Sequence, residues 1–325
     1  MPASRQKVAP EGVLTSARHK DGKRKSEQDT YQHVVGQSVS STNRLAPIQA
    51  VRPIILSIAG FDPSGGAGIL ADLKTFAAMG VYGMACITSL TIQSTQGVRR
   101  VEGVDASTVI ETLDCLASDA CFSSIKVGML GTGEVVAAVA DWLAGQKDVP
   151  VVLDPVLKSS SGKDLLDVRG RDILLERFLA RADWITPNLA ELADLAGHSY
   201  PRTAAETEEA ARQLQQMAGQ QGNSVLKIVV TGGHAESPDD LLLTNDDLRW
   251  FPGERIQTTS THGTGCTFSS ALAAQVALGD DPCKAVQAAK DYVTGALRRA
   301  YPVGRGNGPL DHFWKNSKGE TETIG

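Results

Sequence analysis

The chain has 325 residues, of which 42% are hydrophobic and 5% aromatic, enough apolar material for one large α/β domain or two ordinary ones. The net charge is −5 with a sequence pI near 5.7, and the one dense basic run is His19–Lys25, which argues against a nucleic-acid groove and favours small-molecule partners. No apolar run reaches the roughly 18–20 residues of a membrane span, and the five cysteines form no CxxC pair, so we expect a soluble, cytoplasmic protein with free thiols.

Residues 1–50 mix Lys, Arg, Gln, Ser and Thr with few bulky apolar side chains. Such a segment cannot bury enough surface to offset the entropy of ordering, so we predict a disordered tail. Its basic run would suit a targeting or docking element as well as a solvated tail. No internal repeat or linker divides the rest of the chain, which predicts a single domain over 51–315 and a short tail over 316–325.

From Ile54 onward, short β-branched runs alternate with amphipathic stretches. The runs predict strands at 54–59, 84–92, 124–130, 149–156, 183–186 and 225–233. The stretches between them predict helices near 66–79, 105–119, 132–144, 169–180 and 203–219. This alternation indicates an α/β fold with a mainly parallel central sheet and helices on both faces. In such sheets, ligands bind beyond the carboxyl ends of the strands.

The pattern changes toward the C-terminus. Residues 239–253 predict two short strands around Asn245 and Asp246, which would form a hairpin. Apolar residues spaced three and four apart then predict two final helices, one beginning at the 261–267 loop and one over about 286–297.

The stretch "AGFDPSGGAGILADLKTF" joins the first strand to the first helix, a place where phosphate-binding loops are common. It is no Walker A loop, because Gly66 and Ala67 stand where Lys and Ser/Thr are required. It also fails as a dinucleotide fingerprint, since no acid follows about 20 residues later to bind a ribose. We therefore interpret the glycines as room for a flat substrate. Asp72 is then either a directed polar contact or a solvent-facing residue early in a helix.

The stretch "THGTGCT", residues 261–267, directly precedes a helix. The backbone N–H groups of 263–266 would form an anion hole there, because a helix N-terminus is electropositive. Cys266 would lie where thiol pKa values fall from about 8.5 toward neutrality, the range of a general base. The alternative is a small buried thiol under a glycine turn. His262 is interpreted as a loop histidine without a catalytic role.

Two further motifs follow strands. In "TPNLAEL", Asn188 and Glu191 have the spacing of a capping box, but Glu191 could instead be an outer-sphere magnesium partner together with Asp154 at the end of "VVLDP". In "VVTGGH", Gly232 and Gly233 predict either a backbone that touches nucleotide phosphate or simply a tight turn.

Taken together and in this order, the motifs resemble the ribokinase-like kinases, and specifically the hydroxymethylpyrimidine/phosphomethylpyrimidine kinases of thiamine biosynthesis. The matching stretches span about residues 54–313, and they include "YGMACITSLTIQSTQGV" and "KVGML" beside these motifs. Related sugar kinases usually carry an aspartate at the position of Cys266. The resemblance implies phosphorylation of 4-amino-5-hydroxymethyl-2-methylpyrimidine and then of its monophosphate, with ATP and Mg²⁺, by a homodimer.

The resemblance also implies site residues. The pyrimidine pocket would comprise Gly60, Ala67, Asp72, Gln93, Met129 and Val156, with Asp72 and Gln93 on the aminopyrimidine edge. The catalytic group would be Cys266 with the anion hole of Gly263, Thr264 and Gly265. ATP would contact Thr231, Gly232, Gly233 and Asn188, while Asp154 and Glu191 would hold magnesium and its waters.

Two positions depart from the family pattern. Phe61 stands where relatives commonly have Ser or Thr, and Lys158 is displaced from the position directly before a Ser-Gly. The alternatives to the pyrimidine kinase are a pyridoxal or pyridoxine kinase on the same scaffold, or a non-catalytic pyrimidine sensor.

Overall fold

The computed structural model describes residues 52–159, 162–233 and 237–316. The chain divides into two units, Met1–Ala50 and Val51–Gly325, and all of the described residues belong to the second. The predicted tail over 1–50 and residues 317–325 of the predicted C-terminal tail lie outside the described residues. The domain boundaries therefore stay predictions.

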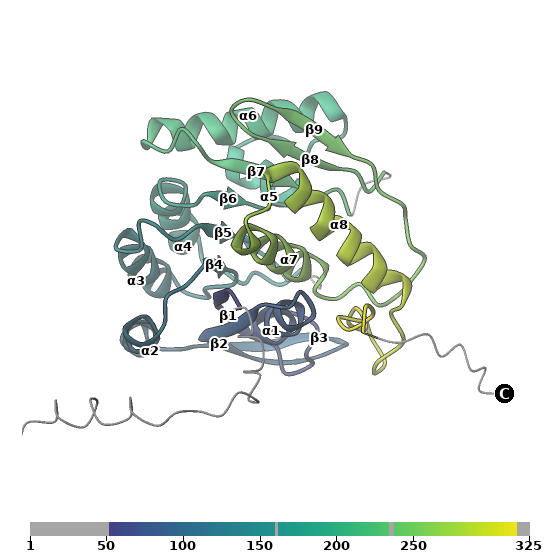
Figure 1. Ribbon diagram of the computed structural model, residues 1–325, viewed down its shortest axis with the longest axis horizontal. Coiled ribbons are helices and arrows are strands. Elements are labelled where there is room, and N and C mark those ends of the chain that lie inside the picture. Colours follow the sequence, from purple (N-terminus) through teal and green to yellow (C-terminus); the bar gives the residue numbers. More distant parts are fainter. Residues whose placement is uncertain (1–51, 160–161, 234–236, 317–325) are drawn as a thin grey trace, which may run out of the picture. The chain divides into compact units, whose positions relative to one another are not determined.

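The described strands form one nine-stranded sheet in the order β3-β2-β1-β4-β5-β6-β7-β8-β9 (Figure 1). From β2 through β7 in this order the neighbours pair in parallel, whereas β3, β8 and β9 pair antiparallel. The prediction of a mainly parallel sheet is confirmed. The strands are β1 (Ile54–Phe61), β2 (Tyr82–Ser94), β3 (Gly97–Gly103), β4 (Ser124–Val127), β5 (Val151–Leu153), β6 (Trp184–Ile185), β7 (Lys227–Val230), β8 (Asp240–Leu243) and β9 (Leu248–Phe251).

Helices cover both faces of the sheet, as predicted (Figure 1). One face packs against α1 (Gly68–Ala78), α7 (Thr264–Leu278) and α8 (Pro282–Arg298). The other packs against α2 (Ala106–Asp119), α3 (Gly133–Ala144), α4 (Val168–Ile173) with its π-helical continuation Leu174–Phe178, α5 (Leu189–Ala196) and α6 (Ala204–Gln220).

Alternation along the strands sends side chains to both layers. In β1, Ile55 joins the core under α7 and α8, while Leu56 and Ile58 join the core under α2 and α3. All three side chains are fully buried. Since both faces are covered, the parallel strands are mostly apolar, with a few buried polar residues such as Ser57 and Lys126, and they therefore stand out as apolar runs in the sequence.

One strand was not predicted. β3, "GVRRVEG", pairs antiparallel with β2 at the edge of the sheet and carries Arg99, Arg100 and Glu102. Charged side chains suit an edge strand, because they discourage pairing with other chains. They also remove the apolar signal that the other strands provide. β2 correspondingly extends to Ser94, beyond the predicted end.

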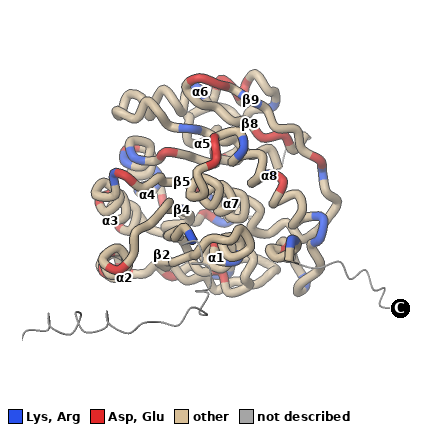
Figure 2. The backbone as a smooth tube through the Cα atoms, in the orientation of Figure 1, with Lys and Arg blue, Asp and Glu red and all other residues tan. Residues whose placement is uncertain are grey.

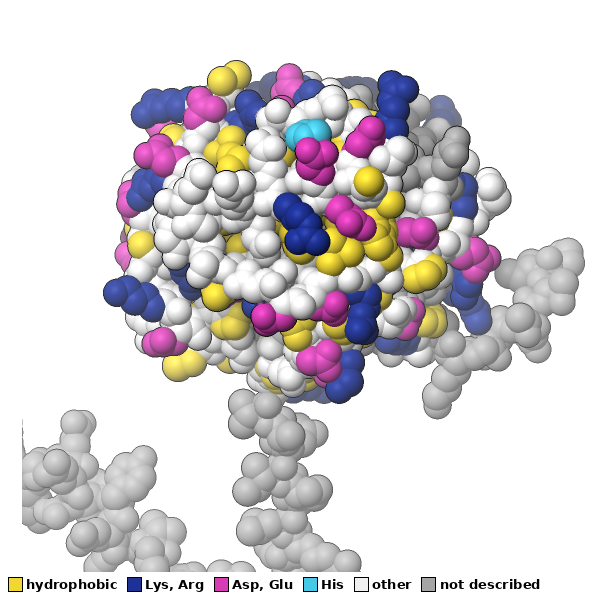
Figure 3. Space-filling model, turned by 90° about the horizontal axis from the view of Figure 1, so that it is seen from above, with side chains coloured by type: hydrophobic (Ala, Val, Ile, Leu, Met, Phe, Trp, Pro, Cys, Tyr) yellow, Lys and Arg dark blue, Asp and Glu magenta, His cyan; other side chains and the backbone are white. Residues whose placement is uncertain are grey.

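Charges are mixed over the domain. Figure 2 shows Lys and Arg interspersed with Asp and Glu along the chain, and Figure 3 shows both signs among small apolar areas on one face. Among the described residues, no helix has the length and apolar character that crossing a membrane demands. All five cysteines are free thiols.

Candidate active site

Most of the predicted site residues lie where parallel strands end. Gly60 is the second-last residue of β1, Gln93 is near the end of β2, and Met129 follows β4. Asp154 follows β5, and Asn188 and Thr231 follow β6 and β7. Because the carboxyl ends of parallel strands meet at one edge of the sheet, the structure gathers these residues at one side of the domain.

The loop after β1 is organised by Asp62. Its Oδ1 accepts hydrogen bonds from the backbone N–H (2.8 Å) and hydroxyl (2.7 Å) of Ser64. Its Oδ2 accepts from the backbone N–H groups of Gly66 (3.2 Å) and Ala67 (2.9 Å). This buried carboxylate therefore determines the path of the glycine-rich turn, a role that the sequence interpretation did not assign.

A second loop packs directly on this turn and leaves no space for a side chain at Gly66. A Cβ at Gly263 would lie 1.7 Å from the carbonyl oxygen of Gly66, and one at Gly66 would lie 2.4 Å from the ring of His262. A Cβ at Gly60 would lie 2.9 Å from Ser89 Oγ and 3.0 Å from Met129 Sδ. The loop after β1 and the loop before α7 are thus in direct backbone contact, and Gly60 is packed against the predicted pocket residue Met129.

His262 links these two loops to Gln93. Its Nε2 lies 2.7 Å from Oδ2 of Asp62 and 3.0 Å from the side-chain amide of Gln93. The sequence interpretation gave His262 no role. The signal that could have located it is its position directly before a glycine motif that must pack against the first loop.

Asp72 does not lie where it was predicted. Its side chain is fully buried, with Oδ2 accepting from Ser57 Oγ (2.5 Å) and Oδ1 from Ser270 Oγ (2.7 Å). Both oxygens also lie 3.1 Å from Nζ of Lys126. With its acceptor sites occupied inside the protein, Asp72 cannot pair with a pyrimidine edge, and that prediction is wrong. Neither is it the solvent-facing residue of the alternative.

Lys126 is a site residue that the sequence interpretation missed. It lies in the middle of β4, it is fully buried, and it pairs with Asp72 and, at 3.8 Å, with Asp154. Burial lowers the pKa of Lys126, but the carboxylates of Asp72 and Asp154 raise it above its usual value, so the side chain is charged. A lysine between Ile125 and Val127 in a buried strand was the available signal, because an unpaired buried ammonium is very costly.

Asp154 and Glu191 lie close enough for their charges to interact. Burial raises the pKa of Asp154, with Lys126 and a hydrogen bond from Ser269 Oγ (3.0 Å) opposing that rise. Burial and then the charge of Asp154 raise the pKa of Glu191 to about 8. Glu191 also accepts the Asn188 backbone N–H at 3.0 Å, which completes a capping box on α5. The capping-box prediction is confirmed.

The N-terminus of α7 lies beside these carboxylates. Gly263 is the N-cap at φ +83°, and no side chain caps the helix, so the N–H groups of the first turn point outward without intrahelical partners. Ser269, on the next turn of α7, donates its hydroxyl to Asp154. This arrangement can hold an anion at the helix terminus next to a buried lysine.

The thiol of Cys266 departs from its predicted chemistry. Burial raises its pKa to about 12, and the Asp154 and Asp72 carboxylates oppose the lowering effect of Lys126. The thiol hydrogen-bonds to Asp154. The prediction that this pKa falls toward neutrality is therefore wrong, since desolvation and two carboxylates outweigh the lowering effects of Lys126 and of the Gly68 backbone N–H.

The predicted ATP contacts after β6 and β7 are only partly free. The Thr231 N–H donates to the Pro187 carbonyl (2.9 Å), and the Gly232 N–H donates to Asp240 Oδ1 (2.9 Å). The side-chain oxygen of Asn188 accepts from the first N–H groups of α5. Gly233 is exposed, with no atom within 4 Å of where its Cβ would be. Of these four residues, Gly233 offers the most accessible backbone.

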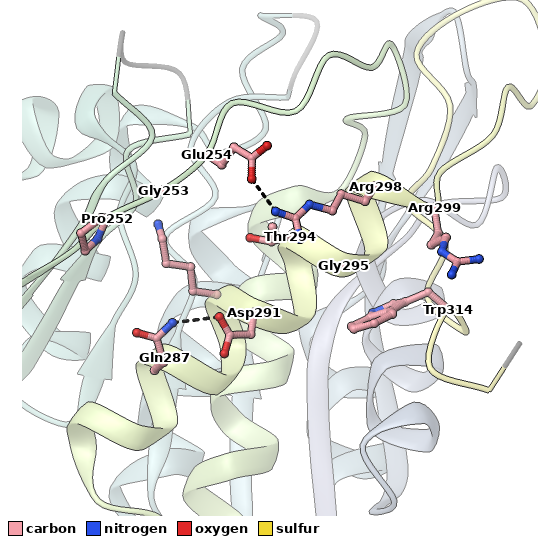
Figure 4. A pocket seen from close by; sticks show the side chains of 11 residues that line it. Pro252, Gly253, Glu254, Gln287, Asp291, Thr294, Gly295, Arg298, Arg299 and Trp314 are labelled. Carbon is pink, nitrogen blue, oxygen red and sulfur yellow. Dashed lines mark hydrogen bonds and ion pairs between the residues drawn. The ribbon is translucent and has the colours of Figure 1, made fainter. Parts of the chain in front are cut away.

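A separate hollow of about 550 Å³ lies between α8 and the segment after β9 (Figure 4). It is lined by Pro252, Gly253, Glu254, Gln287, Lys290, Asp291, Thr294, Gly295, Arg298, Arg299 and Trp314. None of the predicted site residues lines it. It is nevertheless joined to the end of β7, because Lys290 Nζ lies 2.8 Å from Asp240 Oδ2 and Asp240 also accepts the Gly232 N–H.

The two departures from the family pattern have simple structural settings. Phe61 ends β1, its side chain is half-buried, and its carbonyl accepts from Thr91 Oγ1 at 3.0 Å. Lys158 is exposed and lies 3.9 Å from Asp164. The two serines after Ser159 lie outside the described residues.

Residues 62–311 match the family model described as phosphomethylpyrimidine kinase. The chain belongs to the phosphomethylpyrimidine kinase family. It is 42% identical over 272 residues to the hydroxymethylpyrimidine/phosphomethylpyrimidine kinase of Rhizobium meliloti, covering 81% of this chain and 99% of that protein. This family membership confirms the resemblance on which the sequence interpretation relied, and it makes the protein a phosphotransferase.

Solved structures place the kinase in the ribokinase-like fold. The phosphomethylpyrimidine kinase of Clostridium difficile 630 aligns with a TM-score of 0.66 at 30% identity, covering 76% of this chain and all of that one. The pyridoxal kinase of Bacillus subtilis, solved as an ADP complex, aligns with a TM-score of 0.72 at 31% identity, covering 82% of this chain and 99% of that one. The fold is thus shared by kinases named for two different ring substrates.

Proposed function

We propose that the kinase transfers the γ-phosphoryl group of ATP to 4-amino-5-hydroxymethyl-2-methylpyrimidine and then to the resulting monophosphate, in thiamine biosynthesis. The family match and the 42% identical relative support this substrate. The observation that carries the proposal is the contact between the loop after β1 and the loop before α7. Through Gly66, Gly263 and His262, the predicted pyrimidine residues meet the helix N-terminus at which phosphate charge would be stabilised.

In this arrangement the protein mainly positions the two substrates and neutralises charge on the transferred phosphoryl group. The pyrimidine ring would lie against Gly60, Ala67, Met129 and Val156, with Gln93 supplying the directed contact. The N–H groups of Gly263, Thr264, Gly265 and Cys266 would stabilise the charge that develops on the transferred phosphoryl group. Lys126 lies close enough to this helix terminus to interact with Cys266, but its charge there is opposed by its partners Asp72 and Asp154.

Cys266 acts in this proposal as a neutral thiol rather than a thiolate. Its pKa near 12 leaves it protonated at physiological pH, hydrogen-bonded to Asp154. A phosphoryl transfer through a loose transition state makes little demand on a base, so a small group that places the hydroxymethyl oxygen in line with the phosphate is sufficient. Cys266 would therefore activate the acceptor mainly by position.

The residues present fit Mg²⁺ as kinases usually hold it. No cluster of three or more His, Cys, Asp or Glu side chains suited to a metal occurs in the described ranges. Asp154 and Glu191 are two neighbouring carboxylates, and kinase Mg²⁺ is bound by one or two carboxylates together with phosphates and waters. Asp154 and Glu191 would hold the ion or its waters, and the ion would neutralise charge on the phosphates.

ATP would contact the exposed Gly233, together with Thr231 and Asn188. The Gly232 N–H would not contact ATP, because its hydrogen bond to Asp240 stabilises the turn.

A homodimer in the cytoplasm is also part of the proposal. The free thiols support a reducing compartment, and the dimer rests on the family resemblance. Light scattering on the purified protein tests the dimer, and a mass of one chain at micromolar concentration would exclude it.

The direct test is a product time course. Purified protein, ATP, Mg²⁺ and the hydroxymethylpyrimidine are incubated, and mono- and diphosphate are separated at successive times. The proposal expects monophosphate to appear first and to be converted to diphosphate. Absence of any phosphorylated pyrimidine would overturn the proposal. Accumulation of monophosphate without any diphosphate would show that the second phosphorylation does not occur.

A pyridoxal kinase is the second candidate. The 31% identity and TM-score of 0.72 to the Bacillus subtilis pyridoxal kinase favour it, because that protein presents the same fold to another ring carrying a hydroxymethyl group. The same assay with pyridoxal as acceptor measures this activity.

A further inference from the structure

His262 is held firmly between the two loops of the site. Its ring packs on Gly66, and its backbone N–H donates to the Gly308 carbonyl at 3.0 Å. Only 14% of its side chain is exposed. Its Nε2 is shared between Asp62 Oδ2 at 2.7 Å and the side-chain amide of Gln93 at 3.0 Å. A ring nitrogen in this position must either donate or accept, and it cannot do both.

Asp62 decides which of the two occurs. Burial raises the pKa of Asp62. Hydrogen bonds from His262 and Ser64 together lower it by more than burial raises it, so the pKa is below its usual value. The carboxylate is therefore ionised at neutral pH, and its oxygens only accept. Nε2 of His262 must then carry the proton and donate it to Asp62.

The protonated Nε2 in turn constrains Gln93. The two arms of a glutamine amide are equal in shape but opposite in hydrogen bonding, so the partners determine which arm faces which way. In the structure the amide nitrogen of Gln93 faces Nε2, a pairing of two donors that a 180° rotation of the amide converts into a hydrogen bond. Because Nε2 of His262 carries a single proton, it can bind the amide oxygen of Gln93 by sharing that proton between this oxygen and Asp62 Oδ2 in a bifurcated hydrogen bond.

We propose that Asp62 and His262 orient the amide of Gln93, with its oxygen toward His262 and its NH₂ group toward the acceptor substrate. This inference rests on the proposed function, in which Gln93 contacts the pyrimidine. His262 is then a positioning residue that determines specificity, because it acts on the substrate only through Gln93.

An amide held in this way recognises one kind of ring edge. Its NH₂ donates to a ring nitrogen, and the second lone pair of its oxygen accepts from a neighbouring exocyclic amine, as glutamine does at the edge of adenine. The 4-aminopyrimidine edge has this pattern. The isosteric 4-oxo compound presents a carbonyl and a ring N–H, the reverse pattern, and would need the amide turned over.

The test compares kcat/KM for the 4-amino substrate and its 4-oxo isostere. Wild type should prefer the 4-amino compound by roughly 10- to 100-fold, the discrimination typical of a bidentate amide contact. His262→Phe keeps a ring on Gly66 but has no N–H, so the amide can rotate and the preference should fall to within about threefold. His262→Gln restores an N–H near the position of Nε2 and should recover most of the preference.

A merely structural role for His262 would lower kcat/KM for both compounds and leave their ratio unchanged. That result overturns the inference, as does a wild-type enzyme that phosphorylates both compounds equally well. Thermal unfolding verifies that the variants fold, and His262→Leu replaces the phenylalanine variant if that one does not. If wild type phosphorylates neither compound while its fold is intact, the proposed function itself has failed.

Discussion

The thiol of Cys266 lies among a lysine and two carboxylates at a helix terminus, and desolvation dominates its chemistry. With a pKa near 12, the thiolate fraction at pH 8 is lower than that of a free thiol by on the order of 1,000-fold. We therefore expect iodoacetamide to alkylate Cys266 about that much more slowly than it alkylates N-acetylcysteine, as followed by peptide mass spectrometry. The exposed Cys115 and Cys121 provide internal controls for reagent access. Alkylation of Cys266 as fast as the free thiol would contradict the assignment of a neutral thiol.

Glu191 predicts a pH dependence of stability. Its pKa is about 8 in the folded chain and about 4.3 unfolded, so between these values the folded state binds more protons and stability falls as pH rises. Glu191→Gln removes this loss and still fits a capping box. In the absence of ATP and Mg²⁺, the variant should exceed wild type in Tm by at least about 5 °C at pH 9 and differ little at pH 4.5.

The matched control is Glu134→Gln, in the exposed first turn of α3. It should not change the Tm difference between the two pH values. Equal stabilisation by Glu191→Gln at both pH values would exclude a perturbed carboxyl as the cause.

For single residues, the sequence predicted the place of a residue along a helix or strand better than it predicted the burial and charged neighbours of its side chain. The capping box of Asn188 and Glu191 was predicted because it depends on residues three apart in the chain. The burial of Asp72 was not, because its partners Ser57, Lys126 and Ser270 come from three distant segments. The pKa of Cys266 could not be predicted for the same reason, since it depends on carboxylates brought in by the fold.

Among the elements, α7 depends on two glycines in the same left-handed conformation. Gly263 (φ +83°) precedes it and Gly279 (φ +86°) follows it. Alanine at Gly279 meets nothing within 4 Å and should cost only the backbone strain, about 1–2 kcal/mol. Alanine at Gly263 carries the same strain and also meets the Gly66 carbonyl oxygen at 1.7 Å.

We expect Gly263→Ala to lower Tm clearly more than Gly279→Ala and to remove most of the kinase activity, because the two loops of the site must separate. Thermal unfolding and kcat/KM on the two variants measure this. Equal effects on both quantities would mean that contact between the loops is not needed for the site.

The helices could be predicted from the periodicity of their apolar residues, and the buried strands from their short runs of β-branched residues. The predicted hairpin is present as β8 and β9, with Thr244 and Asp247 closing the turn around Asn245 and Asp246. β3 could not be predicted, because an exposed edge strand has charges where the inner strands have Val and Ile. The apolar signal is weakest at the edge of the sheet, and this edge adjoins Gln93.

For the whole molecule, the parallel sheet explains why residues from six segments meet at one side of the domain. That much follows from the strand-helix alternation, since ligands bind beyond the carboxyl ends of such strands. The direct contact between the loop after β1 and the loop before α7, some 200 residues apart, does not follow from it. The glycines of the first loop thus admit another backbone, a role that is distinct from the predicted room for a substrate.

We expect this site to act on a hydroxymethylpyrimidine in preference to pyridoxal. Steady-state kcat/KM for the two alcohols, measured with the same enzyme, ATP and Mg²⁺, tests this preference most directly. The oriented Gln93 and the family membership predict a kcat/KM for the pyrimidine at least about tenfold higher, since the pyridine offers no amino group beside a ring nitrogen. A higher kcat/KM for pyridoxal would contradict the proposed function.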